Sequence, residues 1–238
     1  MSQSAQPPPP KIRNNILCSL APDEMERLAP HLKSINLAHG DILFDVGDTI
    51  DLVYFPNEAM ISVVASTVAG QTAESGVIGW EGVGGVEVLM GDPQSLNRHI
   101  IQLPGEALAA PTAVVQAEFA RGGNLQRSTL AFVRALIAQM SQTVLCNRLH
   151  IAEKRLAKWL LMCHDRAPGD VLHITQEFAA LMLGSNRVSV TQAAIQLQDR
   201  SLIEYTRGRI TIVDREGLET FCCECYERIK DEFVRVTS

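Results

Sequence analysis

Hydrophobic and polar positions divide the chain into a short helical start, a β-rich stretch and a long helical remainder. Between residues 14 and 37, apolar residues such as Leu17, Met25 and Leu28 recur at roughly helical spacing, which predicts helix. From 38 to 118 the pattern changes to short apolar runs (DILFDVGD, DLVYFP, MISVVAST, ESGVIGW, HIIQLPG, EALAAP) separated by Gly, Asp, Asn and Pro. Runs at about ten-residue intervals are typical of a β-barrel or sandwich of short strands.

A long helix is predicted from about 124 to 149. Its apolar residues recur at steps of three and four and form a near-heptad stripe, continued by Ile151: Leu130, Val133, Ile137, Met140 and Val144. Such a stripe either packs on the chain's own β-domain or pairs with a second copy. We expect this helix to form a homodimer.

The segment from 152 to 213 has the pattern of a helix-turn-helix followed by a hairpin. After a helix from Ala152 to His164 and a Pro-Gly turn, Thr175 is placed to cap a second helix, which Gly184 ends. Asn186 is placed to cap a third helix, with Val190, Ala194 and Leu197 turned inward. SLIEY, TRGR and ITIVD then predict strand, turn and strand.

The outward side of the third helix carries the residue types that read DNA. Arginine bonds guanine, glutamine bonds adenine, and apolar or threonine methyl groups contact thymine. The predicted base-contacting residues are Arg187, Val188, Thr191 and Gln192. Hydroxyl, amide and guanidinium groups around them suit phosphates. The predicted backbone-contacting residues are Thr175, Ser185, Asn186, Ser189, Arg207 and Arg209.

The stretch ITQEFAALMLGSNRVSVTQAAIQLQDRSLIEYTRGRITIVD resembles the winged-helix DNA-binding domain of Crp/Fnr bacterial transcription regulators. The resemblance extends over about residues 14–215 and implies an α+β fold. The N-terminal residues, which begin MSQSAQPPPPK, are polar and proline-rich, so residues 1–13 are predicted to be a disordered lead. The parts that follow would be a jelly-roll-like β-roll sensor of the cyclic-nucleotide-binding type (14–123), a dimerisation helix (124–150) and a winged helix-turn-helix with a C-terminal helix (151–238). The resemblance also implies a homodimer on a near-palindromic operator, control through the β-roll, and RNA polymerase as a partner.

Two positions of the third helix depart from the family pattern. Arg187 matches the family's base-contacting arginine, but Val188 stands where a glutamate is common and Gln192 where a second arginine is common. Valine cannot accept a hydrogen bond from cytosine, so base preference there should change.

A candidate effector pocket comes from the same resemblance. The glycine-rich segment could present backbone N–H groups to an anion, with Arg98 at the family's phosphate-binding position. The residues are Trp80, Glu81, Gly82, Gly84, Gly85 and Arg98. His99 replaces the usual small hydroxyl residue, and Gly105-Glu106 follows Arg98 instead of preceding it. These departures weigh against a cyclic nucleotide, leaving an unidentified ligand or none; a haem at His31, His39 or His99 stays open.

Charge adds modest support for DNA binding. The net charge is −6, yet residues 153–213 carry 8 basic and 6 acidic side chains, a local net of +2. No apolar run reaches the ~18 residues of a membrane span and no signal peptide is visible, so we expect a cytoplasmic protein without a membrane partner.

Cysteine spacing and catalytic motifs predict neither a metal site, a cofactor nor an enzyme. Cys222, Cys223 and Cys225 form a tight cluster without CxxC pairs, and reduced thiols on a C-terminal helix are the favoured interpretation over a redox or metal role. Only Cys18 lies near the N-terminus, too few thiolates for an iron–sulfur cluster. P-loop, GxGxxG, HExxH and GxSxG motifs are missing. The alternative function is a cyclic-nucleotide-responsive effector that does not act through DNA.

Overall fold

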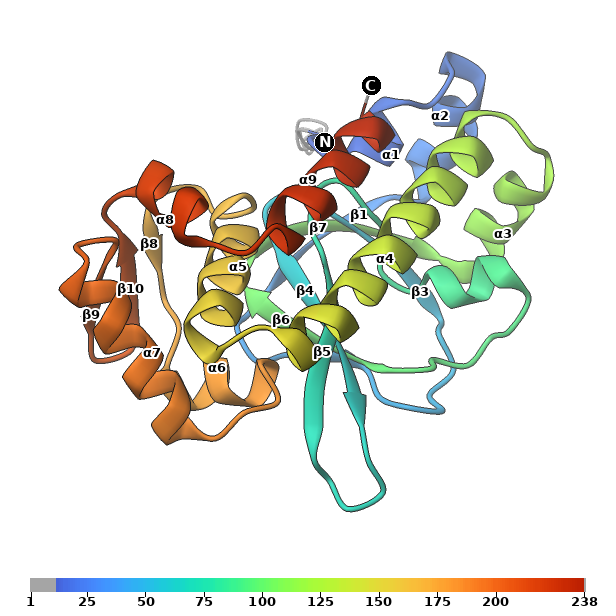
Figure 1. The fold of residues 1–238 in the computed structure, drawn as a ribbon. Helices are drawn as coiled ribbons and strands as arrows, with labels where there is room; N and C mark the ends of the chain where they lie inside the picture. Colours follow the sequence, from blue (N-terminus) through green and yellow to red (C-terminus); the bar gives the residue numbers. More distant parts are fainter. Residues whose placement is uncertain (1–11, 238) are drawn as a thin grey trace, which may run out of the picture.

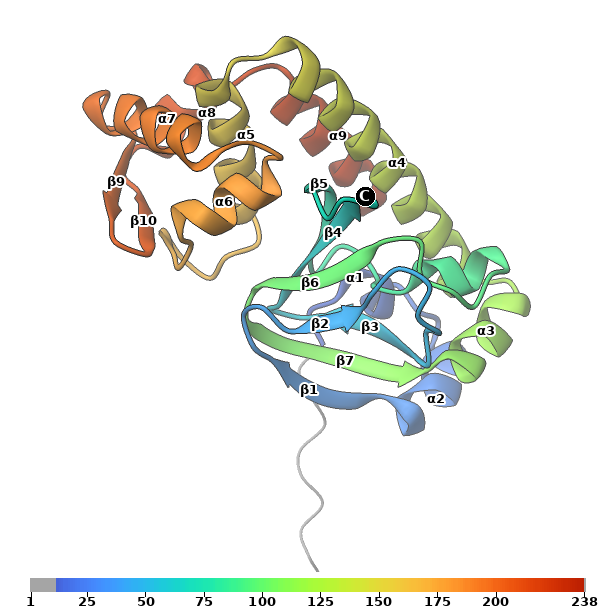
Figure 2. The same ribbon diagram turned by 90° about the horizontal axis from the view of Figure 1, so that it is seen from below.

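The computed structural model describes residues 12–237 and confirms the predicted α+β class. A β-roll, a long helix and a winged helix-turn-helix follow one another along the chain (Figure 1). Figure 2 shows the β-roll and the winged region as two lobes joined by helices α4 and α5. Most of the predicted disordered lead, residues 1–11, lies outside the described residues.

The β-roll consists of two antiparallel sheets, ordered β1-β7-β3 and β2-β6-β4-β5. Its strands are β1 (Lys33–Leu37), β2 (Ile42–Phe44), β3 (Leu52–Pro56), β4 (Met60–Ser66), β5 (Thr72–Ile78), β6 (Arg98–Leu103) and β7 (Gly105–Pro111). β2 to β7 follow the predicted apolar runs. The β4–β5 hairpin is long, pairing Ile61 with Ile78 at its base and Ser66 with Thr72 near its tip. A 3-10 turn, η2 (Val86–Met90), separates β5 from β6.

Two elements differ from the sequence prediction. Helix was predicted through residue 37, but the chain forms only α1 (Asn15–Cys18), α2 (Pro22–Leu28) and the turn η1 (Ala29–His31) before β1 begins. β1 pairs with β7 over its whole length, and this sheet pairing outweighs the helical spacing. Helix α3 (Thr112–Ala120) follows β7 directly, where no helix was predicted.

Helix α4 (Asn124–Leu149) runs beside the C-terminal helix α9 (Cys225–Thr237) (Figure 1). Phe132 of α4 lies 6.4 Å from Phe233 of α9, measured between ring centroids. Among the described residues, α4 is the one helix long and apolar enough to cross a membrane. Arg134 and Gln139 interrupt its apolar sequence, and its buried side packs on β5 and α9, while other apolar side chains such as Ile137 and Val144 stay exposed in the single chain.

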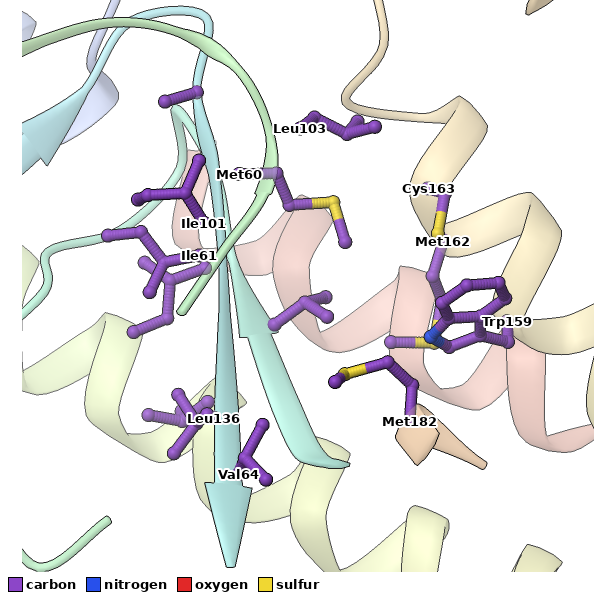
Figure 3. Packing of buried hydrophobic residues seen from close by; sticks show 14 of the residues in the cluster. Met60, Ile61, Val64, Ile101, Leu103, Leu136, Trp159, Met162, Cys163 and Met182 are labelled. Atoms are coloured by element: carbon purple, nitrogen blue, oxygen red, sulfur yellow. The ribbon is translucent and has the colours of Figure 1, made fainter. Parts of the chain in front are cut away.

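The β-roll and the helix-turn-helix share one apolar core. Helix α5 (Ala152–His164) places Trp159, Met162 and Cys163 opposite Met60 and Leu103 of the roll (Figure 3). Figure 3 also shows Leu136 of α4 beside the same sheet. The β-roll and the helix-turn-helix are therefore held together by burial as well as by covalent linkage.

Buried polar contacts cross this shared core. Trp159 Nε1 donates to Glu74 Oε1 at 3.0 Å, and Ser62 Oγ donates to Glu74 Oε2 at 2.7 Å. Arg166, just after α5, donates to Glu81 Oε1 through Nη2 at 2.6 Å and through Nε at 2.8 Å. Arg166 and Glu81 are both buried, so their charges are paired away from water.

Burial raises the pKa of Glu74 from its ordinary value of 4.5 to about 7, against the opposing effects of Ser62 and Lys158. The folded protein therefore keeps this proton to higher pH than the unfolded chain. The resulting contribution to stability is fully present below pH 4.5 and is lost as pH rises through about 7. Relative to Glu74→Gln, the wild-type free energy of unfolding should fall by up to about 3 kcal/mol between pH 4.5 and pH 8. Parallel urea titrations of the two proteins across this range test the prediction, which equal pH dependences would contradict.

Arg166→Met should destabilise the fold by about 3–5 kcal/mol, because it leaves the Glu81 carboxylate buried without its partner. Adding Glu81→Gln should recover much of the loss, since glutamine keeps an oxygen to accept the Gly79 N–H and carries no charge. Urea unfolding at pH 7 measures both variants. A loss below about 1 kcal/mol in the single variant would mean that the pair does not behave as a buried ion pair.

Candidate nucleic-acid interface

The predicted helix-turn-helix is formed by α6 (Gln176–Met182) and α7 (Arg187–Asp199). Thr175 Oγ1 accepts a hydrogen bond from Phe178 N at 3.1 Å, and Asn186 Oδ1 accepts one from Ser189 N at 2.8 Å. These are the two predicted N-caps. Gly184 takes the predicted left-handed conformation, with φ of 54°, and turns the chain between the helices.

Helix α7 buries one side and exposes the side that was predicted to contact bases. Val190, Ala194 and Leu197 are buried as predicted, and the small Ala193 lies with them. Arg187 and Gln192 are exposed, and Val188 is 66% exposed. Within residues 12–237, the Arg187 guanidinium has no ion-pair or hydrogen-bond partner. It is therefore available to an acceptor outside the chain.

Thr191 is half-buried, and its hydroxyl has partners within the protein. Thr191 Oγ1 lies 2.9 Å from Gln176 Oε1 and 2.8 Å from Arg187 O, and it can donate its single hydrogen to one of them. The Thr191 hydroxyl thus helps to fix α7 against α6. Its methyl group remains for an apolar contact with a base.

The predicted backbone-contacting residues surround this helix start. Ser185 and Ser189 are half-buried, while Thr175 and Asn186 are exposed and use their oxygens as caps, which leaves the Thr175 hydroxyl hydrogen and the Asn186 amide hydrogens to donate.

The wing is the hairpin of β9 (Ile203–Thr206) and β10 (Arg209–Ile212). Its turn carries Gly208 with φ of 76° between the exposed Arg207 and Arg209. The short strand β8 (Val171–Leu172), not predicted, pairs with β10 and makes this a three-stranded sheet.

The β4–β5 hairpin lies against the turn of the helix-turn-helix. A groove lined by Thr72 and Ala73 on one side and by Leu181, Ser185 and Asn186 on the other separates them. The approach is close, since a Cβ added to Gly184 would lie 2.9 Å from Ala73 Cβ. Leu181 is 45% exposed, because it borders this groove instead of the core.

The candidate effector residues do not gather into one pocket. Arg98 pairs with Asp45 at 2.5 Å, between Nη2 and Oδ2, so its charge is already neutralised. The N–H groups of Gly82 and Gly84 donate to Gly79 O and Tyr54 O, and Gly85 provides a left-handed turn before η2. Two of the amides that were expected to face an anion are therefore used within the protein.

Trp80 and Glu81 lie elsewhere, on a cavity of about 230 Å³ between the roll, the end of α5 and α9. Met162, Arg166, Tyr226 and Phe233 also line it. This cavity was not predicted, because residues from three distant segments of the chain form it.

Helix α8 (Arg215–Phe221) leads from the wing towards α9. Asp214 caps α8, and Arg215 reaches back to Asp165 at 2.5 Å after α5. The C-terminal segment thus contacts the chain just after α5 through Arg215, and α9 then packs on α4.

A β-roll is joined through a long helix to a winged helix-turn-helix whose second helix exposes the side predicted to contact bases. This arrangement is typical of DNA-binding transcription regulators. Residues 154–221 match the family model of the Crp-like helix-turn-helix domain. The match confirms the predicted DNA-binding transcription regulator with a Crp-like helix-turn-helix domain. No curated protein matches the sequence.

Solved structures of Crp/Fnr regulators share the fold at low sequence identity. FixK2 from Bradyrhizobium japonicum is 13% identical with a TM-score of 0.68, over 81% of this chain and 98% of its own. A putative transcriptional regulator of the Crp/Fnr family from Eubacterium rectale is 16% identical with a TM-score of 0.66, over 91% and 100%. The c-di-GMP responsive global regulator CLP of Xanthomonas campestris is 13% identical with a TM-score of 0.65, over 81% and 99%. The β-roll, long helix and helix-turn-helix predicted from the sequence are thereby confirmed as a fold.

Proposed function

We propose that the protein binds a near-palindromic operator as a homodimer and reads each half-site with the N-terminal part of α7. The observation that carries this proposal is the exposure of Arg187, Val188 and Gln192 over a buried side that fixes α7 against the rest of the domain. A helix held in this way enters the major groove with its first turns at the base edges. The wing arginines, Arg207 and Arg209, then lie beside the phosphate backbone of the DNA.

The residue types on α7 suggest what each half-site contains. Arg187 has the geometry for a bidentate contact with guanine, and Gln192 with adenine. Val188 offers only an apolar surface, which suits a thymine methyl group. We therefore expect an operator that differs from those read through glutamate and a second arginine at these positions.

Helix α4 offers the surface for the homodimer. Along its outer side an apolar row repeats every seven residues, with Leu130 52% exposed, Ile137 59% exposed and Val144 72% exposed. Ile151, which was predicted to continue the row, lies beyond the end of α4 at the N-cap of α5 instead, because the chain is extended at His150. Val133 and Met140 are partly buried on the core beside it. An exposed heptad row of this kind buries itself against a second copy of the same helix.

The β4–β5 hairpin could carry a change in the β-roll to the DNA-binding helix α7. The hairpin lies beside Ser185 and Asn186, two of the proposed phosphate contacts. A change in the roll that moves the hairpin would alter how α7 is presented to DNA. The effector stays unassigned, because Arg98 is paired with Asp45 and the amides of Gly82 and Gly84 donate to carbonyl groups of the protein.

A regulator of this type works on the chromosome, so we propose a cytoplasmic protein that acts with RNA polymerase at promoters. Gel-shift titration with genomic fragments, in excess non-specific competitor DNA and at stated salt, tests the function. Retention of a small set of fragments supports it. Uniform binding to all fragments, or none, would favour the effector that does not act through DNA.

A further inference from the structure

Four metal-ligating side chains meet where α4 ends and α9 begins. Cys146 and His150 lie one helical turn apart at the end of α4, while Cys223 and Cys225 flank Glu224 at the start of α9. One ligand atom from each of the four lies within 4.8 Å of all the others. The two pairs are more than 70 residues apart in the sequence, so the fold alone brings them together.

The spacing of these atoms suits a single tetrahedral ion. Cys146 Sγ lies 3.7 Å from Cys223 Sγ, and Cys225 Sγ lies 3.5 Å from His150 Nδ1. Bond lengths of about 2.3 Å to sulfur and about 2.0 Å to nitrogen give tetrahedral edges of about 3.8 and 3.5 Å. An iron–sulfur cluster spreads its ligands around several iron and sulfide atoms, and this set is too compact for it.

The surroundings also suit a metal. Cys146, Cys223 and Cys225 are buried, and none of them forms a disulfide. The second ring nitrogen of His150, Nε2, lies 3.6 Å from Glu224 Oε1, so a carboxylate is close to it, although at more than hydrogen-bond distance. Three thiolates around a divalent ion leave one negative charge. Lys158 of α5 is buried and donates to Thr143 Oγ1, one helical turn before Cys146 on α4, at 3.3 Å, so a cation lies near these thiolates.

We propose that Cys146, His150, Cys223 and Cys225 bind one Zn²⁺ in a closed Cys3His structural site. Each thiol releases its proton to solvent on binding, and no redox change is involved. Zinc favours this mixture of thiolate and imidazole over oxygen-preferring ions. The ion ties the start of α9 to the end of α4, next to the junction where α5 leads into the DNA-binding region. It therefore fixes that junction without touching α7 or DNA.

Metal content of the full-length protein, purified with reductant and without chelator, tests the proposal. We expect about one zinc per chain by mass spectrometry of the metal. Replacing zinc with Co²⁺ should give the strong visible absorption of a tetrahedral thiolate site, with sulfur-to-cobalt charge transfer in the near ultraviolet. Cys223→Ser and Cys225→Ser should lower metal content at least about tenfold.

Cys222→Ser is the matched control, because Cys222 adjoins Cys223 but its Sγ faces Lys154 O at 3.9 Å. This variant should keep the full zinc content. If a ligand variant fails to fold, His150→Cys supplies a second test, since four thiolates should retain Co²⁺ and strengthen the charge-transfer band. Wild-type protein without stoichiometric zinc even after reconstitution would overturn the proposal, as would a Cys146–Cys223 disulfide in freshly purified protein or equal loss of zinc in Cys222→Ser.

Discussion

Arg187→Ala should weaken operator binding by about 100-fold or more, because each half-site loses a bidentate contact worth about 1–3 kcal/mol and the dimer carries two of them. The free energy of unfolding should stay within about 0.5 kcal/mol of wild type, since the side chain is exposed and has no partner within residues 12–237. Fluorescence anisotropy with a labelled operator, together with urea unfolding, measures both quantities.

Gln196→Ala is the control for this prediction. Gln196 is exposed on the same helix but lies more than two turns beyond Arg187, outside the part of α7 that reaches base edges. Its removal should leave operator affinity nearly unchanged. Equal losses in the two variants would assign the effect to the helix as a whole and contradict base reading by Arg187.

The double variant Ile137→Glu with Val144→Glu should convert the dimer to a monomer and lower operator affinity by about 100-fold or more, since the second half-site contact then no longer adds to the first. Both side chains are mostly exposed in the single chain, so the fold should persist. Carboxylates facing each other across the helix pair would be buried without partners. Sedimentation equilibrium and operator titration on the same preparations give the two readouts.

Val46→Glu makes the same chemical change at an exposed apolar residue of the β-roll, away from α4. It should leave both the oligomeric state and operator affinity unchanged. A double variant on α4 that stays dimeric, with wild-type affinity, would place the dimer surface elsewhere.

The helix boundaries of the DNA-binding part could be predicted from the sequence, because they depend on interactions between residues close together in the chain. Thr175, Gly184 and Asn186 specify where helices start and stop through bonds to nearby backbone, and the structure has each of them in the predicted role. The alternation of short apolar runs likewise predicted β2 to β7. The contacts to bases and phosphates are predictions that DNA-binding measurements must test.

The features that sequence reasoning missed depend on contacts between distant segments. β1 has helical spacing but becomes a strand because β7 pairs with it, and β8 exists because β10 lies beside it. The Glu74–Trp159 and Glu81–Arg166 contacts join residues 85 apart in each case.

The proposed zinc site also depends on contacts between distant segments of the chain. The Cys146–His150 spacing of four and the Cys223–Cys225 spacing of two are weak signals separately. Their meeting depends on α9 turning back along α4, which the sequence did not predict. The effector prediction depended on family position alone and did not anticipate that Asp45 would pair with Arg98.

In the proposed complex, one dimer places two copies of α7 in successive major grooves of one duplex. Hydroxyl-radical footprinting on a fragment retained in the gel shift tests it most directly. We expect two protected half-sites related by a dyad, with centres about 34 Å, or one helical turn, apart, and loss of both with Arg187→Ala. A single protected half-site, or protection that persists without Arg187, would contradict the account.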